Sequence, residues 1–190
     1  MRIVGGEFRG RALKSPRSPA TRPTSDRVRE TIFDILAHRY GLPAKETRVL
    51  DLFAGTGALG LEALSRGAAS CLMVESAAAA RGIIRDNIEA LALTGRARIY
   101  RRDATDLGAV GTVLPFDLLF ADPPYGEGFA ARALAAAAKG DWMSTGAIAV
   151  VEESLGSAFE APVGFELLER REVGETAITF LRWQGEEFGA

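Results

Sequence analysis

Apolar segments of two lengths alternate along most of the chain. Short apolar runs, rich in Val, Leu, Ile and Phe, predict buried strands at residues 48–53, 71–75, 98–101, 116–121 and 147–152. Longer segments repeat apolar residues every three or four positions and predict four helices. The first runs from a Thr24 or Ser25 cap through residue 36, and the second runs through Leu61 to residue 66. The third runs from about residue 77 to 93, and the fourth spans residues 130–138. Strands that alternate with helices are typical of a parallel, doubly wound sheet.

The last part of the chain has a different pattern. Residues 165–171 and 176–183 alternate apolar and polar positions around Val173-Gly174-Glu175, which predicts an antiparallel hairpin. Together with the five buried strands, this hairpin makes a mostly parallel seven-stranded sheet. The expected fold class is therefore α/β and Rossmann-like, with an antiparallel C-terminal hairpin at the edge of the sheet.

The first 23 residues follow neither period. Glycines and prolines interrupt them, so they cannot form one long helix, although residues 1–4 and 11–13 could be short strands of a hairpin. We therefore divide the chain into a basic N-terminal arm or hairpin at 1–23 and one folded domain at 24–190. In the helix that follows, the apolar stripe leaves Arg27, and Arg29 in part, free to face solvent or substrate.

Charge is unevenly distributed between the arm and the domain. The net charge is −2, but residues 1–29 carry eight basic and two acidic side chains, whereas the remaining residues carry 15 basic and 23 acidic ones. A cationic segment on an acidic body is expected where one face meets a polyanion such as nucleic acid. The candidate phosphate-binding residues are Arg9, Arg11, Arg22 and Arg27. The alternative is a solvated, disordered tail.

The composition argues against several other classes of function. The single cysteine, Cys71, cannot form an intrachain disulfide, and the single histidine, His38, has no companion with ligand spacing, which argues against a zinc site and a Ser-His-Asp triad. No run of about 18 apolar residues predicts a membrane span, and the Arg-bearing N-terminus lacks the apolar core of a signal peptide. We expect a cytoplasmic protein without a metal and without a membrane partner.

A glycine pattern follows the first predicted strand. Gly55-x-Gly57-x-x-Gly60 lies between strand and helix, and Glu75 comes twenty residues after Gly55, a combination that also fits a dinucleotide-binding fold. Asp51, however, lies four residues before Gly55, at the end of the strand. A carboxylate there would oppose a pyrophosphate but suits a ligand that carries an ammonium or sulfonium cation.

Acidic residues also end other strands of the predicted sheet. The carboxyl ends of parallel strands meet at one edge, where open α/β sheets bind ligands. Asp103 follows the third strand, in a position to accept a hydrogen bond from an adenine amino group. Singly, each of these acids could be a helix cap or turn residue; the set is Asp51, Glu75, Asp103 and Asp122. As a set at matching positions, they predict one ligand crevice.

The fourth strand runs into Asp122-Pro123-Pro124-Tyr125. Neither proline has a backbone N–H, so the sheet cannot continue and the chain forms a rigid elbow. The Asp122 carboxylate and the Pro123 carbonyl offer hydrogen-bond acceptors, and the Tyr125 ring offers a flat face for a planar substrate. These groups together could bind a planar amine, although Asp-Pro-Pro is also a common sequence in ordinary turns.

The order of these motifs resembles the class I S-adenosylmethionine-dependent methyltransferases, and the elbow is similar to the Asp/Asn-Pro-Pro-aromatic signature of enzymes that methylate exocyclic amines of adenine or guanine. The N-terminal sequence looks like the start of the bacterial RsmD family; it comprises residues 5–11 (GGEFRGR) and 21–33 (TRPTSDRVRETIF). Asp34 is a departure, because Asn or a small polar residue is expected at that position. The resemblance spans nearly the whole chain and implies guanine-N2 methylation of 16S ribosomal RNA.

The resemblance also implies roles for individual residues. The glycine loop would contact S-adenosylmethionine, Asp51 would lie below its methionine part, Glu75 would bind the ribose and Asp103 the adenine. The implied cofactor-binding residues are Asp51, Phe53, Ala54, Gly55, Thr56, Gly57, Glu75, Asp103 and Ala104. The implied catalytic residues are Asp122, Pro123, Pro124 and Tyr125. The implied partner of the arginines in the arm is 16S ribosomal RNA or the small ribosomal subunit particle, and we expect a monomer.

Three alternatives remain open at the level of the sequence. An adenine-N6 methyltransferase acting on DNA or RNA would use the same elbow. An NAD-dependent oxidoreductase would explain the glycine pattern and Glu75 but leaves Asp51, Asp103 and the elbow without a role. A noncatalytic RNA-binding protein on a methyltransferase scaffold would not need the set of acids.

Overall fold

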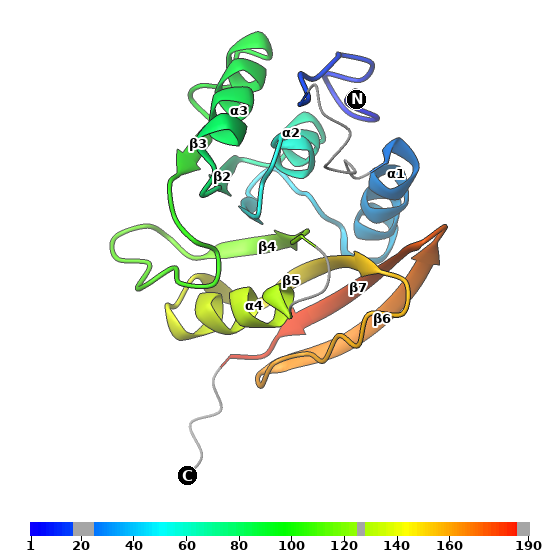
Figure 1. Ribbon diagram of the computed structural model, residues 1–190, viewed down its shortest axis with the longest axis vertical. Helices are drawn as coiled ribbons and strands as arrows, with labels where there is room; N and C mark the ends of the chain where they lie inside the picture. Colours follow the sequence, from blue (N-terminus) through cyan, green and yellow to red (C-terminus); the bar gives the residue numbers. More distant parts are fainter. Residues whose placement is uncertain (17–24, 125–127, 186–190) are drawn as a thin grey trace.

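The computed structural model describes residues 1–16, 25–124 and 128–185, which are organised around a seven-stranded sheet in the order β3-β2-β1-β4-β5-β7-β6 (Figure 1). The strands are β1 (Arg48–Leu52), β2 (Ser70–Val74), β3 (Ala97–Tyr100), β4 (Phe116–Ala121), β5 (Met143–Ser154), β6 (Phe165–Val173) and β7 (Thr176–Trp183). The helices are α1 (Asp26–Ile35), which continues into the π-helical turn η1 (Leu36–Tyr40), α2 (Ala58–Ser65), α3 (Ala78–Ala90) and α4 (Phe129–Lys139). The predicted seven-stranded α/β fold is confirmed.

Of the seven strands, β7 alone runs against the others. The strands β3, β2, β1, β4 and β5 are parallel neighbours, whereas β7 pairs antiparallel with both β5 and β6. Strand β5 begins four residues before the predicted start at residue 147. The reason is a register shift next to β4, where Phe116 pairs with Met143 but Leu118 already pairs with Ile148. This irregularity hides the start of the strand from a simple apolar pattern.

Helices cover both faces of the sheet, and alternate strand residues pack against each layer (Figure 1). Residue Val49 of β1 belongs to the core cluster that contains the apolar residues of α1, α2 and α3. On the same strand, Leu50 and Leu52 point to the opposite face and belong to the cluster that contains the apolar residues of α4. Because side chains alternate along a strand, Asp51 points to the same layer as Val49, toward α2. This orientation determines the environment of its carboxylate.

The first 16 residues, called the N-terminal hairpin below, pack on the domain. An antiparallel bridge joins Arg2 to Ala12, and the apolar side chains of Ile3 and Leu13 are buried in the same core cluster as α1 and α2. Phe8 is partly buried against that cluster. The hairpin therefore contributes to the hydrophobic core, whatever it binds with its exposed arginines.

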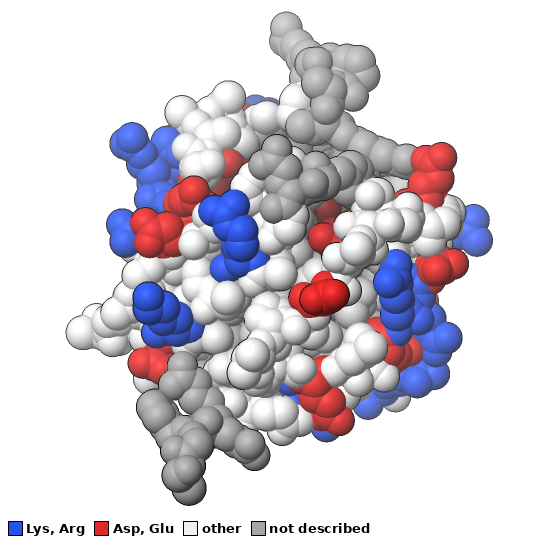
Figure 2. All heavy atoms as spheres, turned by 60° about the horizontal axis from the view of Figure 1, so that its bottom comes forward, with Lys and Arg blue, Asp and Glu red and all other residues white. Residues whose placement is uncertain are grey.

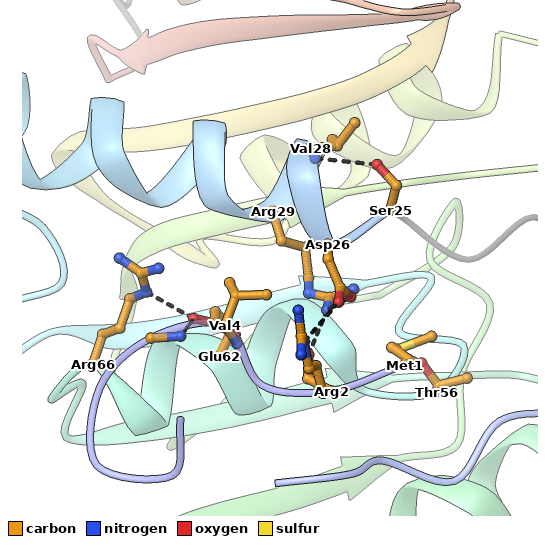
Figure 3. Close-up of polar contacts among 11 residues, drawn as sticks. Met1, Arg2, Val4, Ser25, Asp26, Val28, Arg29, Thr56, Glu62 and Arg66 are labelled. Carbon is orange, nitrogen blue, oxygen red and sulfur yellow. Dashed lines mark hydrogen bonds and ion pairs between the residues drawn. The ribbon is translucent and has the colours of Figure 1, made fainter. Parts of the chain in front are cut away.

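The carboxylate of Glu62 in α2 anchors the turn of this hairpin (Figure 3). It is fully buried and accepts hydrogen bonds from the backbone nitrogens of Val4 and Gly5, each at 2.8 Å, and from Arg66 Nε at 2.8 Å. One turn later, Ser65 Oγ accepts from Phe8 N at 2.9 Å. Three hydrogen-bond donors thus compensate the burial of the Glu62 carboxylate. Two of them are backbone N–H groups of the hairpin, so this carboxylate fixes the turn of the hairpin against α2.

Helix α1 begins where the sequence predicts it, but one of its arginines is buried instead of exposed. Ser25 Oγ accepts from Val28 N at 3.2 Å and caps the helix. The expectation that Arg29 is partly free was wrong, because its side chain is fully buried. Its Nη2 atom donates to the carbonyl of Arg2 at 2.5 Å and to Asp26 Oδ1 at 2.7 Å (Figure 3). The N-terminal hairpin covers this position, which the helical period alone does not reveal.

The single cysteine and the single histidine have ordinary structural positions. Cys71 is a buried free thiol, and His38 is exposed, with Nδ1 2.8 Å from the carbonyl oxygen of Asp34. Within residues 1–16, 25–124 and 128–185, no group of three or more His, Cys, Asp or Glu side chains could hold a metal ion. No helix in this part of the chain is both long and apolar enough to cross a bilayer.

Candidate active site

The glycine loop connects β1 to α2 with three left-handed residues. Phe53, Gly55 and Gly57 have φ angles of 61°, 57° and 79°. Glycine adopts this region without a steric penalty, whereas for Phe53 it costs roughly 1 to 2 kcal/mol. The loop is held by hydrogen bonds from Gly57 N to Ala54 O at 2.6 Å and from Ala54 N to Val74 O at 3.0 Å. It delivers the chain into the N-terminus of α2, beside the carboxyl ends of β1 and β2.

Glu75 follows β2 and joins the glycine loop to the start of α3. Its Oε2 atom accepts from Gly55 N at 2.9 Å, and its Oε1 atom accepts from Ala77 N at 2.7 Å. The side chain is half-buried. A carboxylate oxygen accepts more than one hydrogen bond, so both oxygens keep lone pairs for further donors such as hydroxyl groups. The predicted ribose-binding residue therefore also orients the loop.

Asp51 lies deeper than a strand-end position implies. Its side chain is 1% exposed, and Oδ2 accepts from Gly60 N at 2.9 Å. Burial raises the pKa of the Asp51 carboxyl to about 7; the Gly60 hydrogen bond lowers this pKa, and the charges of Asp122 and Glu75 raise it. A cation placed nearby would favour the ionised carboxylate. Without one, much of the Asp51 population is protonated at neutral pH.

Gly60 permits this approach of helix to strand. A Cβ atom at Gly60 would lie 2.6 Å from Cys71 Sγ and 3.0 Å from Asp51 Oδ2, so a side chain there would displace one of them. The third glycine of the pattern thus serves close helix–strand packing and gives the Asp51 carboxylate its backbone donor.

Asp103 and Ala104 lie three residues or more beyond β3. Asp103 is exposed and Ala104 is buried. Asp103 Oδ1 accepts from both the backbone nitrogen and the hydroxyl of Thr105, each at 2.8 Å, and the backbone hydrogen bond lowers the pKa of Asp103 below its ordinary value. This is the turn geometry that an isolated aspartate commonly adopts. It leaves Asp103 ionised at neutral pH, as an acceptor requires.

The elbow after β4 lies directly beside the glycine loop. Strand β4 pairs with β1 in a register that places Phe120 opposite Asp51 and Ala121 opposite Leu52. Asp122 is half-buried, Pro123 is buried and Pro124 is exposed, whereas Tyr125 lies outside the described residues. The influence of Asp122 and Glu75 on the Asp51 pKa shows that these three acids share one electrostatic environment. The structure therefore brings together the predicted donor-binding and amine-binding groups.

Two aromatic rings and an arginine adjoin this site without having been predicted as a group. The Phe129 ring, at the start of α4, lies 6.4 Å from the Phe53 ring, centroid to centroid. The guanidinium of Arg132 lies over the Phe129 ring at 5.5 Å, and its charge also lowers the Asp103 pKa. Phe129 follows the Asp-Pro-Pro-Tyr stretch by four positions, so its place near the site follows from the fold of the elbow rather than from a recognisable motif.

Three of the four predicted phosphate-binding residues lie in the N-terminal hairpin and the first turn of α1. Arg9, Arg11 and Arg27 are exposed, and Arg22 lies outside the described residues. Elsewhere the charges are mixed: on the face shown in Figure 2, basic and acidic side chains are interspersed. Among the residues coloured there, that face presents no continuous basic surface to a polyanion. The positive excess of the N-terminal segment is a local feature.

Comparisons with known proteins agree with this geometry. Residues 1–182 match the family model described as conserved hypothetical protein 95. The chain is 36% identical over 179 residues to ribosomal RNA small subunit methyltransferase D of Escherichia coli strain K12, covering 93% of this chain and 87% of that protein. It is 31% identical over 177 residues to the enzyme of the same name from Haemophilus influenzae, covering 92% and 89%. Among solved structures it is similar to an Escherichia coli protein assigned as a methyltransferase, yhhF, with a TM-score of 0.81, 32% identity and coverage of 98% and 99%.

Proposed function

Since the chain belongs to the conserved hypothetical protein 95 family, the family of RsmD methyltransferases, we propose that it transfers a methyl group from S-adenosylmethionine to the exocyclic N2 amine of a guanine in 16S ribosomal RNA. The observation that carries this proposal is the position of the Asp122 elbow beside the glycine loop and the buried Asp51 carboxylate. The proposed amine-binding group and the proposed cation-binding group then lie side by side at the same end of the sheet. The reaction would take place in the cytoplasm.

The residues around the glycine loop fit a sulfonium-containing methyl donor. Asp51 is a buried acid whose charge is incompletely compensated by protein groups, and a cationic ligand would stabilise its ionised form. Glu75 would accept hydrogen bonds from ribose hydroxyls, and Asp103 would accept one from the adenine amino group, next to Ala104. When bound, S-adenosylmethionine supplies an electrophilic methyl group on a positively charged sulfur.

The elbow addresses the main difficulty of the reaction, which is the weak nucleophilicity of an exocyclic amine. Its nitrogen lone pair is delocalised into the ring. The Asp122 carboxylate and the Pro123 carbonyl, by accepting the two amine hydrogens, would favour a pyramidal nitrogen with its lone pair directed at the methyl group. Positioning of this kind contributes several kcal/mol or more to lowering a barrier. The proton can leave to Asp122 or to water after transfer.

Tyr125 would hold the target base by stacking, an interaction worth about 1 to 3 kcal/mol. Where the guanine is paired or stacked in the RNA, it must first be turned out at a cost of a few kcal/mol. The exposed arginines Arg9, Arg11 and Arg27, together with Arg22, would bind the RNA backbone while the base enters the site.

A transfer assay tests the proposal. Purified protein is incubated with methyl-labelled S-adenosylmethionine and either naked 16S RNA or small-subunit particles from a strain that lacks the enzyme. We expect label in N2-methylguanosine; label in N6-methyladenosine would favour the adenine alternative, because the elbow serves either amine. No incorporation into either substrate would contradict the proposed function. Tight binding of NADH but not of S-adenosylmethionine would favour an oxidoreductase, against which the buried Asp51 argues.

The salt dependence of RNA binding tests the proposed role of the arginines. Replacing Arg9, Arg11 and Arg27 together by alanine should weaken RNA binding and reduce the slope of log K against log salt by roughly 0.7 to 0.9 for each phosphate that is no longer neutralised. Replacing Arg170 and Arg171, which are exposed on the edge strand β6, is the matched control and should leave the slope unchanged. Equal slopes for all three proteins would assign the N-terminal arginines to a role other than RNA binding.

A further inference from the structure

The buried side chain of Asn87 in α3 connects two segments that are far apart in the sequence. Its Oδ1 atom accepts from Lys14 N at 2.7 Å, and its Nδ2 atom donates to Lys14 O at 3.1 Å and to Thr56 O at 3.0 Å. The side chain is 1% exposed. The reversed amide would place Oδ1 against two carbonyl oxygens, so the partners determine its orientation. One amide therefore holds the N-terminal hairpin and the glycine loop at once.

On the side of the loop, Asn87 binds the peptide unit between Thr56 and Gly57 through its carbonyl oxygen. The Thr56 carbonyl accepts from Asn87, and the nitrogen of the same peptide unit, Gly57 N, donates to Ala54 O at 2.6 Å. Both polar ends of the unit are thereby engaged within a loop that contains three left-handed residues. A small rotation of this unit would redirect the backbone that the methyl donor has to approach. Asn87 is thus placed to set the shape of the loop.

On the side of the hairpin, the turn that precedes Lys14 is held by α2. Glu62 and Ser65 bind the backbone of the turn, and Glu7 N donates to Ser65 O at 2.8 Å. Gly6, with φ of 76°, lies against this carbonyl so closely that a Cβ atom would be 2.0 Å from Ser65 O. A displacement of the hairpin from α2 would move Lys14 and hence the Asn87 amide. A second contact reaches the loop directly, since Thr56 Oγ1 donates to Met1 Sδ at 3.6 Å (Figure 3).

We propose that Asn87 is a positioning residue of the methyl-donor site, through which the seating of the N-terminal hairpin on α2 determines the shape of the glycine loop. The proposal rests on the proposed function for the identity of the methyl donor and of the RNA. Because the hairpin also carries Arg9 and Arg11, two of the arginines proposed to bind RNA, RNA on the hairpin and methyl donor in the loop influence each other's binding. By linkage, the effect on the two affinities is reciprocal.

A double-mutant cycle tests this coupling, with the affinity for S-adenosylhomocysteine measured by calorimetry. Gly6→Ala forces the hairpin away from the rigid Ser65 carbonyl, and Asn87→Ala removes the link to the loop. Gly10→Ala is the matched control: Gly10 lies in the same hairpin with a similar φ of 84°, but a Cβ atom there would meet nothing within 4 Å. Both alanines carry the same type of backbone strain, and only one of them displaces the hairpin.

We expect Gly6→Ala and Asn87→Ala each to weaken binding about fivefold or more, in the range of typical coupling effects, and Gly10→Ala to leave it near the wild-type value. In the Asn87→Ala background, Gly6→Ala should have a clearly smaller effect than in the wild-type background, because only the Met1 contact with Thr56 then joins the hairpin to the loop. A residue that only stabilises the fold would lower the unfolding midpoint without this non-additivity. Wild-type affinity in Asn87→Ala, or equal effects of Gly6→Ala in both backgrounds, would overturn the proposal.

Amide hydrogen exchange in the ligand-free protein gives a second, independent readout. Exchange in the peptide that covers the glycine loop should rise in Gly6→Ala relative to Gly10→Ala, with exchange in β7 as the internal reference for global unfolding. If wild type does not bind S-adenosylhomocysteine, the proposed ligand is wrong, and the exchange data still decide whether the hairpin controls the loop. Asn87→Ser, which is too short to reach both partners, replaces Asn87→Ala if the latter does not fold.

Discussion

Replacing Asp122 by alanine is expected to lower the rate of methyl transfer by about 100-fold or more, which is the loss seen when a reacting group is misplaced by a small distance or is deprived of one preorganised polar partner. The carboxylate would no longer accept a hydrogen of the target amine, so the amine would return to its planar, weakly nucleophilic form. The affinity for S-adenosylmethionine should remain near the wild-type value, because the glycine loop and Glu75 are intact. Single-turnover kinetics and calorimetry measure the two quantities separately.

Asp117 provides a matched control on the same strand. It lies at the opposite end of β4, where its carboxylate accepts from Arg48 N at 2.9 Å and from Ser144 Oγ at 3.1 Å. Asp117→Ala should reduce stability and leave the transfer rate unchanged well below the unfolding temperature. Asp122→Asn, which keeps one acceptor oxygen, should be more active than Asp122→Ala. A fully active Asp122→Ala protein would remove the elbow from the mechanism.

Raising the pH from 5 to 8 is expected to destabilise the ligand-free wild-type protein by roughly 3 kcal/mol relative to Asp51→Asn. Burial raises the pKa of Asp51 from 3.8 to about 7. Between these values the folded protein holds a proton that the unfolded chain has released, so folding stability from this group is complete at low pH and declines until the pH passes 7. Asparagine carries no titrating proton, and its side-chain oxygen can still accept from Gly60 N.

Urea unfolding of both proteins at pH 5, 6, 7 and 8 measures this effect. The quantity of interest is the difference between the two free energies of unfolding at each pH, since other titrating groups contribute to both proteins. The difference should grow from pH 5 to pH 7 in favour of Asp51→Asn and then level off. Parallel curves would show that Asp51 ionises in the folded protein at its ordinary pKa.

The strands and most helices follow from local patterns because local interactions determine them. Buried strands are apolar runs, so β4 is predicted to the residue; the bounds of β7 also agree, although its residues are buried along almost the whole strand and do not alternate between buried and exposed. The start of β5 does not follow, because it depends on a register shift against Phe116 in another strand. The relative positions of Asp51, Glu75 and Asp122 follow from a general property of parallel sheets, namely that strand ends share an edge.

Features that depend on contacts between remote segments could not be predicted in this way. Arg29 is exposed on a helical wheel until the N-terminal hairpin covers it. Glu62 interrupts a helix that is otherwise small and apolar, and Asn87 interrupts the apolar face formed by Ile84 and Ile88. A polar residue on a buried helical face is the signal that could have indicated both. Each binds a backbone segment of the N-terminal hairpin that is more than 50 residues away, which no local pattern identifies.

The attachment of the N-terminal hairpin bears on how the protein should be tagged and trimmed. Every residue of α2 is buried, partly under the hairpin, so a shortened chain that begins after residue 16 would expose this helix and leave the Glu62 carboxylate without its two backbone donors. An affinity tag fused ahead of Met1 would emerge beside Thr56. The end of β7 lies on the far side of the molecule (Figure 1), and a tag placed after it would leave the glycine loop accessible for binding measurements.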